Sequence, residues 1–307
     1  MSDKKTWLAV GVGLCALDYI CIVEKYPVPD QKIDALAFSR QGGGPVATAL
    51  CALGHFGEHV SFIGKVGKDP EGKLIRSELE RFGVSSGSMV FDPYSRTPRA
   101  FIWVDSRTGE RTVVLDRTEI TDLEPKELDT ALLKSCRYLL LDAREAQASF
   151  HAAKIAKDSG AEVVLDVGSP RGNIEELLPM IDHLVVSRTF ADKYTGIEEP
   201  GEASLKLLSK GFKTVVITLG KGGSVCATEG DFFQVDSYNI AVVDTTGAGD
   251  VFHGAYIYGL SKGWQLKEVV EFASAAAAMK CTRIGGRQGI PTVDEVVQFM
   301  EEKRGRL

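Results

Sequence analysis

The chain of 307 residues contains 36 Lys and Arg against 42 Asp and Glu, a formal charge of −6, with 44% apolar and 25% charged residues. These proportions are ordinary for a soluble globular protein and exclude a disordered or collagen-like chain. No apolar run approaches the roughly 18 to 20 residues of a membrane helix, and no long basic block predicts a nucleic-acid or anionic-membrane partner.

The N-terminal residues and the cysteines predict a cytoplasmic protein. Residues 1–14 pair two lysines with a short apolar stretch and contain no small-residue cleavage site of a secretory signal. The six cysteines are scattered, without a C-x-x-C pair or clustered histidines. This spacing argues against a disulfide framework and against a zinc site.

The predicted elements begin with an apolar strand at residues 8–13 and a strand-like pair at 19–24 and 32–39 with no helix between them. From about Gly42 onward, short apolar strands alternate with helical stretches. The strand-then-helix pairs are 60–63 and 73–82, 138–141 and 148–159, 162–166 and 174–180, and 183–186 and 203–209, before a strand at 214–218. Such an alternation is typical of a parallel sheet covered on both faces. The sequence therefore predicts an α/β fold with a doubly wound, mainly parallel sheet.

A second strand-like pair, at residues 99–105 and 109–115, interrupts this alternation. Together the two pairs predict a small, mostly antiparallel sheet. A sheet without its own helices cannot bury both faces, so it should lie over the ligand-binding edge as a lid, pack against a second copy of the chain, or do both. We expect an α/β core at 1–13, 42–92 and 118–307, a β lid at 14–41 and 93–117, and a homodimer formed through the lid.

The strongest local signal is the run D-T-T-G-A-G-D from Asp244 to Asp250, followed by a predicted helix at 251–262. Glycines around an alanine let backbone amides at a helix N-terminus approach an anion closely. A carboxylate in the first turn, here Asp250, could then take a proton from an attacking hydroxyl. The alternative is simple helix capping, because acidic residues are common in first turns.

This run resembles the C-terminal signature of the ribokinase/PfkB family of carbohydrate kinases, D-T-x-G-A-G-D with the final Asp as catalytic base. The resemblance implies a ribokinase-like fold with a nucleotide-binding core and a small β-sheet lid, a small-molecule sugar substrate, ATP as phosphoryl donor and Mg²⁺ carried with the nucleotide. It also implies an anion hole made by the backbone of Gly247, Ala248 and Gly249.

Other family features occur in the expected order along nearly the whole chain. Gly42 and Gly43 match the N-terminal glycine pair that contacts the sugar, and residues 64–72 resemble the G-x-V-G-x-D-x-x-G segment. The loop at 218–223 is similar to the nucleotide loop of the family, with Thr218, Gly220 and Gly223 as candidate contacts. Asp18 matches the hydroxyl-binding Asp. The alternatives are a tight turn for the glycines, an ordinary hairpin for residues 218–223 and a loop carboxylate for Asp18.

The tail at 280–289 is similar to a family loop that can hold a monovalent cation, K⁺, together with residues before the anion hole. The residues so implied are Asp244, Thr246 and the backbone carbonyls near Arg283, Gly285 and Gly289. Carbonyl ligands leave little trace in a sequence, and structural tightening of the loop is the alternative.

Three departures from the family pattern bear on the substrate and the metal. The N-x-x-E segment, which helps organise metal and phosphate, is replaced by S-R-T-F at 187–190. Ala47 replaces a sugar-binding Asn, and Arg144 replaces a Glu that faces the sugar. The chain looks similar to the sulfofructose kinase branch, which also has a basic residue at the position of Lys32. Arg144 and Lys32 could therefore clamp an anionic substituent. The alternative is that Arg144 merely pairs with Glu145 or a core carboxylate and that Lys32 is solvated.

These observations predict an ATP-dependent kinase that phosphorylates a primary hydroxyl of a sugar or sugar derivative, such as sulfofructose or a sugar acid. The alternatives are a nucleoside kinase of the same fold and a non-catalytic sugar or nucleotide sensor. A dinucleotide oxidoreductase fits poorly, because Gly11 and Gly13 are followed by neither the third glycine nor the acidic residue of that fingerprint.

Overall fold

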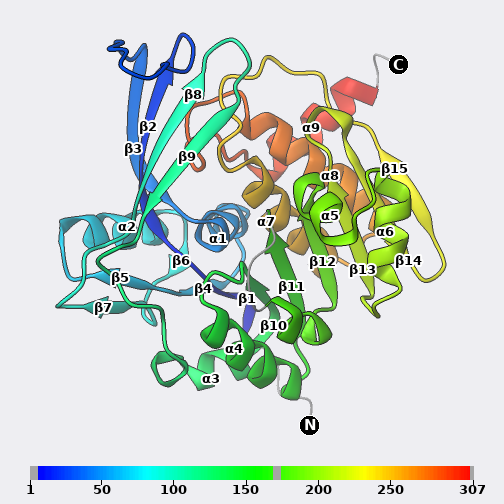
Figure 1. The fold of residues 1–307 in the computed structure, drawn as a ribbon. Helices are drawn as coiled ribbons and strands as arrows, with labels where there is room; N and C mark the ends of the chain where they lie inside the picture. Colours follow the sequence, from blue (N-terminus) through cyan, green and yellow to red (C-terminus); the bar gives the residue numbers. More distant parts are fainter. Residues whose placement is uncertain (1–5, 169–173, 305–307) are drawn as a thin grey trace.

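The computed structural model describes residues 6–168 and 174–304, and its main body is an α/β unit beside a smaller sheet (Figure 1). Within these ranges nine strands form the large sheet. Their order is β15 (Phe232–Val235), β14 (Ser224–Thr228), β13 (Thr214–Thr218), β12 (His183–Ser187), β11 (Glu162–Val167), β10 (Cys136–Leu141), β1 (Trp7–Val12), β4 (Val60–Ile63) and β6 (Val84–Ser85). Pairing is parallel from β6 to β13, and β14 and β15 are antiparallel. The predicted fold class is confirmed.

Helices cover both faces of the large sheet. The described α-helices are α1 (Pro45–His55), α2 (Pro70–Arg81), α3 (Thr130–Lys134), α4 (Ala146–Asp158), α5 (Arg188–Thr195), α6 (Pro200–Leu208), α7 (Ala248–Ser261), α8 (Leu266–Lys280) and α9 (Val293–Arg304). Strand residues alternate between the two faces. Leu140 therefore packs with α1, α7 and α8 in one buried cluster, whereas Leu139 and Leu141 pack with α3 to α6 in another.

The second sheet is a four-stranded lid, composed of β3 (Ala37–Gly43), β2 (Ala16–Val23), β8 (Arg99–Asp105) and β9 (Arg111–Asp116) in that order. The two hairpins are antiparallel, and β2 and β8 join them in parallel. Ile20, Ile22 and Ile102 lie on the inner face, where Ile284 of the loop after α8 packs against them. A pair of short strands, β5 (Lys65–Gly67) and β7 (Val90–Asp92), lies near the lid's base (Figure 1).

Two predicted elements are wrong. Residues 174–180 form not a helix but two 3₁₀ turns, η2 (Ile174–Glu176) and η3 (Leu178–Met180), because Pro179 lacks an amide donor and disfavours helical geometry in the residue before it. Residues 32–36 are not part of a strand, since β3 begins at Ala37 and runs through Gly43. Gly42 and Gly43 therefore belong to the lid strand, and Gly44 caps α1 with a φ of 102°.

Candidate active site

The candidate site lies at the carboxyl ends of the parallel strands, beside the lid (Figure 1). β1, β10 and β11 end side by side, because Val12 pairs with Leu141 and Leu141 pairs with Leu165. Helix α7 begins at the same edge, since His253 in its second turn lies 3.4 Å from the carboxylate of Asp166 on β11. Open α/β sheets bind ligands at this edge.

The D-T-T-G-A-G-D run forms the turn that enters α7. Gly247 is the N-cap residue with a φ of 77°, and a Cβ there would lie 2.6 Å from the Cα of Gly286. Only glycine can adopt this positive φ and also allow the chain at Gly286 to come so close. The amide of Ala248 already donates to the carbonyl oxygen of Thr245 at 3.2 Å. The amides of Gly247 and Gly249 are therefore the better placed of the predicted three to receive an anion.

Asp250 lies half-buried in the first turn of α7, as the sequence predicts. Burial and the neighbouring carboxylate of Asp166 raise its pKa to about 6, against the opposing influence of Arg111 and His253. A carboxyl group with a pKa near 6 is ionised at neutral pH and is a stronger base than an exposed aspartate.

His253 holds the start of α7 in place. Its Nδ1 lies 2.6 Å from the carbonyl oxygen of Gly249, and its Nε2 lies 3.0 Å from that of Val185 on β12. Both ring nitrogens are engaged by backbone. The histidine is therefore a packing and positioning residue, and Asp250 is the group available as a base.

Asp18 lies on β2 beside the glycines of β3, with Asp18 opposite Gln41 in the register. A Cβ on Gly43 would lie 2.1 Å from its Oδ2, so the strand approaches this carboxylate as only glycine allows. Burial raises the pKa of Asp18 to about 7, while the nearby Arg287 guanidinium lowers it and Asp250 raises it further. The predicted sugar-binding residues Asp18 and Gly43 are thus adjacent, and the charge of Asp250 acts on the carboxyl group of Asp18.

Arg287 was not predicted from the sequence, although its side chain is 1% exposed and supports the predicted site. Its Nη1 lies 3.4 Å from Glu78 Oε2, which also accepts the amide of Gly42 at 2.7 Å. Its backbone amide donates to Gln41 Oε1 at 3.1 Å. The loop after α8, helix α2 and strand β3 therefore meet at one buried ion pair behind Asp18.

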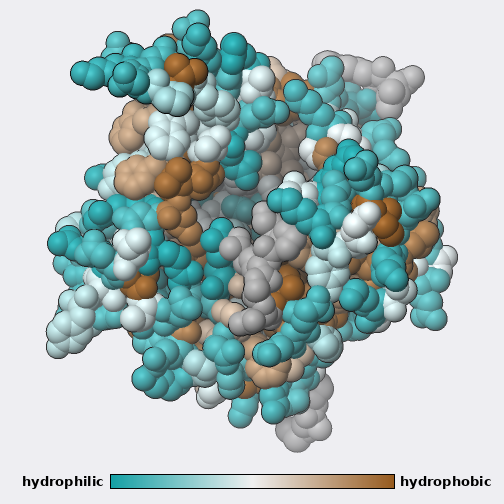
Figure 2. Space-filling view, in the orientation of Figure 1, coloured by the Kyte–Doolittle hydropathy of each residue, from teal (hydrophilic) through white to brown (hydrophobic). Residues whose placement is uncertain are grey.

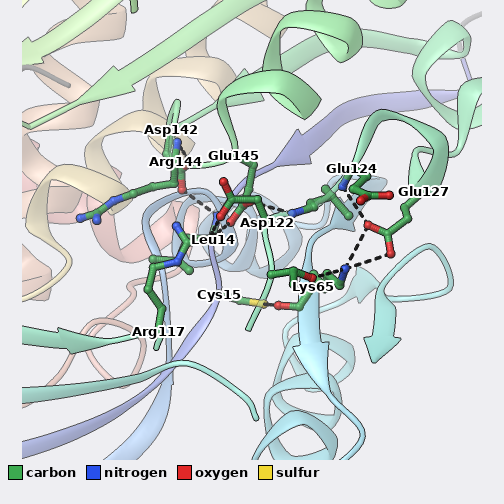
Figure 3. A network of polar contacts seen from close by, with 12 residues as sticks. Leu14, Cys15, Lys65, Arg117, Asp122, Glu124, Glu127, Asp142, Arg144 and Glu145 are labelled. Atoms are coloured by element: carbon green, nitrogen blue, oxygen red, sulfur yellow. Dashed lines mark hydrogen bonds and ion pairs between the residues drawn. The ribbon is translucent and has the colours of Figure 1, made fainter. Parts of the chain in front are cut away.

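Arg144 follows the end of β10, two residues beyond a buried aspartate. Its amide donates to Asp142 Oδ1 at 2.9 Å, and Asp142 Oδ2 accepts the amide of Leu14 at 3.0 Å. Burial raises the pKa of Asp142 to about 7. Glu145 is bound by Arg117 at 3.0 Å and by the amide of Leu123 at 2.8 Å, while the side chain of Arg144 extends away from it (Figure 3). The charge of Arg144 lowers the pKa of Asp142, so the alternative in which Arg144 pairs with a core carboxylate stays a prediction beside the clamp.

Lys32 is exposed in the loop between β2 and β3, at the outer end of the lid (Figure 1). Arg144, by contrast, lies at the edge of the large sheet. The two predicted clamp residues are therefore on different layers of the molecule, and their convergence on a substrate stays a prediction.

The lid contacts the turn before α7 through its β8–β9 hairpin. Gly109 at the tip of this hairpin accepts hydrogen bonds from the amide and the hydroxyl of Thr245, at 3.1 and 2.9 Å. Arg111 of β9 donates from Nη1 to the carbonyl oxygen of Thr245 at 3.2 Å. This side of the lid is thus docked beside Asp250, and Arg111 is a second basic residue there that sequence reasoning missed.

The predicted cation loop surrounds Asp244, which is fully buried. Its Oδ1 accepts the amide of Thr246 at 2.8 Å, its Oδ2 accepts the amide of Gly285 at 2.7 Å, and its carbonyl oxygen accepts Lys280 Nζ at 2.7 Å. Gly289 lies against the end of α8, because a Cβ there would come within 2.5 Å of the carbonyl oxygen of Lys280. The ammonium of Lys280, and not a free space, thus faces Asp244. Arg283 follows at the start of the loop, with its amide bonded to the carbonyl oxygen of Lys280.

The predicted nucleotide loop connects β13 to β14. Thr218 ends β13, and Gly220 begins the turn η4 (Gly220–Gly222). Gly223 has a φ of 81°, and a Cβ there would clash with the carbonyl oxygen of Val235. The hairpin alternative is therefore observed, and nucleotide binding by the same loop stays a prediction. A separate pocket opens near the end of α8, lined by Ile240, Met279, Thr282, Pro291 and Phe299.

Ser187 occupies the start of the missing N-x-x-E segment and acts as the N-cap of α5. Its Oγ accepts the amide of Phe190 at 3.2 Å and donates to the carbonyl oxygen of Gly168 at 2.8 Å. Asp166 precedes Gly168 by two residues and is thus a carboxylate near this segment in the chain. Among the described residues no group of three or more His, Cys, Asp and Glu side chains could hold a metal without other ligands.

The residues that the sequence did not reveal fall into two kinds. Asp142 and Asp166 lie at the carboxyl ends of buried parallel strands, which is a signal that could have identified them. Lys280 ends α8 and Arg287 lies in the loop that follows, and these charged residues only become notable once their burial is known.

Comparison with known proteins gives consistent results. The family model described as pfkB family carbohydrate kinase matches residues 8–293. The ribokinase of Haemophilus influenzae is 28% identical over 299 residues, which cover 94% of this chain and 97% of that protein. Fructokinase-1 of Oryza sativa subsp. japonica is 29% identical over 320 residues, covering 96% of this chain and 98% of that protein. The structure of Arabidopsis thaliana ribokinase complexed with ribose and ATP has a TM-score of 0.82 at 27% identity, over 96% of this chain and 99% of that one.

In the described part of the chain no helix is long and apolar enough to cross a membrane.

Proposed function

The chain belongs to the pfkB family of carbohydrate kinases, and we propose that it transfers the γ-phosphoryl group of ATP to a primary hydroxyl of an anionic sugar derivative. ATP-dependent phosphoryl transfer to a sugar hydroxyl follows from the family and its relatives. The identity of the sugar is the part that we propose. A ketose with an anionic group, such as sulfofructose, or a sugar acid fits the residues at the site.

Asp250 is the proposed general base, and the observation that carries this role is its position in the first turn of α7 with a pKa of about 6. The acceptor hydroxyl would give its proton to the carboxylate of Asp250 while its oxygen attacks the γ-phosphorus and ADP leaves. The amides of Gly247 and Gly249, supported by Ala248, would bind the phosphoryl oxygens.

Asp18, Gly42 and Gly43 are the proposed sugar contacts. A carboxylate can accept two hydroxyl hydrogen bonds, and the Gly43 backbone approaches the Asp18 carboxylate so closely that a sugar could contact both. The neutral and ionised forms of Asp18 are balanced near pH 7 because burial and Arg287 act in opposite directions on its pKa.

Arg144 and Lys32 are the proposed contacts for the anionic substituent. A guanidinium matches the oxygens of phosphate, sulfonate or carboxylate in two-point fashion. Arg144 suits this role because it follows the end of β10, at the edge of the sheet where open α/β folds bind ligands. Lys32 would have to approach with its loop when the lid closes.

The nucleotide would use Thr218, Gly220 and Gly223 for its phosphates and the pocket beside Met279 for adenine. That pocket combines apolar side chains, which suit a flat base, with polar ones such as Gln288 and Glu295. Mg²⁺ fits the site, since the repulsion between Asp166 and Asp250 would be relieved by a divalent cation. When bound, Mg²⁺ neutralises charge on the phosphates. Asp166 would hold it, directly or through water.

We also propose a homodimer through the outer face of the lid. Phe38, Phe101 and Val114 on this sheet are 60%, 39% and 52% exposed, and Tyr19 stacks on Phe101 with centroids 5.6 Å apart. Apolar side chains gather across the lid in Figure 2. Burial of such a surface against a second copy would remove it from water.

A cytoplasmic location fits the proposed role, and the six cysteines are all free thiols.

The test is an ADP-release screen with ATP and Mg²⁺ over neutral ketoses and aldoses, sugar acids, sugar phosphates, sulfosugars and nucleosides. We expect the highest kcat/KM with an anionic sugar. A neutral sugar as best substrate would contradict the proposed anionic group but not the kinase. A nucleoside as best substrate would favour a nucleoside kinase, and ligand binding without turnover would favour a sensor.

A further inference from the structure

A lysine side chain is fully buried at the C-terminal end of α8. Lys280 has no exposed surface, and its Nζ donates to the carbonyl oxygen of Asp244 at 2.7 Å. Removing an ammonium from water is unfavourable unless oxygen atoms and negative charges replace the water. A fully buried lysine therefore requires a compensating environment.

The environment of Lys280 belongs to the turn that forms the anion hole. Burial, together with Arg111, lowers the pKa of Lys280, whereas Cys281 and the carboxylates of Asp244 and Asp250 oppose this shift. The chain around Asp244 is tied to the end of α8 a second time, because the amides of Val243 and Asp244 both donate to the carbonyl oxygen of Cys281. The ammonium thus sits where the end of α8 meets the turn that enters α7.

This location is the one that the family resemblance assigned to a monovalent cation. Asp244, Gly285 and Gly289 were expected to surround K⁺. The carbonyl oxygen of Asp244 accepts the ammonium of Lys280 instead, and Gly289 packs against the backbone of Lys280. Gly285 also presents its amide to Asp244 Oδ2, so that carboxylate oxygen already has a donor. A free cation at the carbonyl oxygen of Asp244 would have to displace the ammonium or lie beside a like charge. All three oxygen atoms of Asp244 thus already have donors, and Asp244 does not fit a bound K⁺.

We propose that the ammonium of Lys280 replaces the monovalent cation, so that this chain needs no K⁺. An ammonium carries the same charge as K⁺ and is of similar size, and its tether to α8 removes the entropy loss of binding a free ion. Lys280 is in this view a positioning residue. It holds the backbone at Asp244, at the start of the turn that contains Gly247, and touches no substrate.

The first test uses the wild-type protein in K⁺, Na⁺ or tetramethylammonium chloride at one ionic strength. We expect the same melting temperature in all three salts, the same kcat with the best sugar from the screen, and no saturable binding of Tl⁺, a K⁺ mimic, by ²⁰⁵Tl NMR. A melting temperature or kcat that K⁺ alone raises with a saturable concentration dependence would overturn the proposal. Melting and Tl⁺ binding require no turnover, so they decide the matter even if the proposed function fails.

The second test compares two substitutions of the same residue. Lys280→Ala would release the carbonyl oxygen of Asp244 near the buried Thr246 hydroxyl, which has no hydrogen-bond partner among the described residues. We expect kcat to fall on the order of ten- to a hundredfold in Na⁺ and to recover severalfold in K⁺, with a K⁺-specific rise in melting temperature. Lys280→Met fills the space without charge and should lose activity without rescue by K⁺.

Lys267→Ala, an exposed lysine on the same helix, is the matched control and should behave as the wild type in every salt. Equal activity of Lys280→Met and the wild type would show that the charge is not needed and would overturn the proposal. A Lys280→Ala variant that folds but ignores K⁺ in melting and in activity would do the same. If that variant does not fold, the wild-type salt series alone distinguishes a tethered ammonium from a bound K⁺.

Discussion

Arg287 and Gly43 are joined by a hydrogen bond of 3.1 Å from the guanidinium Nη2 to the backbone carbonyl oxygen. Through it the loop after α8 fixes the strand that faces Asp18, while the same guanidinium is paired with the buried Glu78. A cation therefore stabilises the backbone that contacts the proposed sugar, although it does not itself need to touch the sugar.

Arg287→Met should destabilise the protein strongly, because it leaves the carboxylate of Glu78 buried without its partner. Breaking a buried ion pair in this way costs about 3 to 5 kcal/mol. The measurement is the free energy of unfolding in urea. Arg304→Met, which breaks a surface pair with Glu271, should cost no more than about 1 kcal/mol. Adding Glu78→Gln to Arg287→Met should restore part of the loss, and an equal cost of the two Arg substitutions would refute this account.

Asp250→Asn should leave folding and ATP binding nearly intact while turnover collapses, because the substitution keeps size and removes the ability to accept a proton. Loss of a general base typically lowers kcat by about 10² to 10⁴. ADP release at saturating substrate measures the effect, and Asp158→Asn at the exposed end of α4 is the control. Retention of more than about a tenth of the wild-type kcat would show that Asp250 is not the base.

The pH dependence of kcat should report the pKa of Asp250. The base must be ionised, so kcat should fall about tenfold per unit below a pH of about 6. Asp166 raises this pKa by like-charge repulsion, so Asp166→Asn should move the inflection to lower pH, whatever its effect on the absolute rate. An inflection that stays in place or moves to higher pH in the variant would contradict the assigned cause.

Arg144→Ala should lower kcat/KM for the anionic substrate by roughly ten- to a hundredfold, because a charged two-point contact in a partly dried site contributes about 1.5 to 3 kcal/mol. Residual activity on a neutral ketose should barely change. Arg137→Ala, an exposed arginine on β10, the strand that precedes Arg144, is the control. Equal losses on both substrates would mean that Arg144 supports the fold and not the anion.

Phe101→Asp should convert the proposed dimer to a monomer, because a charge on the outer face of the lid would be buried against a second copy. Sedimentation velocity over a range of protein concentrations measures the change. Val297→Asp, at a similarly exposed position on α9, should leave the dimer intact. A wild-type protein that is monomeric at tens of micromolar would contradict the proposed assembly.

The large sheet was predictable because its signal is local. Most of β10 and β12 consists of short apolar runs, at 138–141 and 184–186, as parallel strands buried on both faces require. The crossover at 174–180 was mispredicted because apolar spacing alone does not register that Pro179 interrupts a helix. The start of β3 was placed too early because exposed residues 32–36 carry apolar side chains without a partner strand.

The site was predictable where chemistry depends on a short motif. The turn from Asp244 to Asp250 and the glycines of β3 are local patterns, because close backbone approach requires glycine at fixed positions. Lys280 and Arg287 were not predicted because their roles depend on burial against residues that are distant in the sequence. Lys280 meets Asp244 and Arg287 meets Glu78 only in the folded chain, and no spacing in the sequence records either pair.

The parallel pairing of β2 with β8 has a consequence for synthesis of the chain. Leu17 pairs with Arg99 and Val23 pairs with Asp105. The pairing of the two central lid strands, β2 and β8, therefore cannot be completed until residue 105 has left the ribosome. Until then the β2–β3 hairpin presents an open edge and the apolar Ile20 and Ile22 to solvent. The nascent protein is therefore most vulnerable to aggregation before β8 emerges, and a translational pause there would lengthen its need for a chaperone.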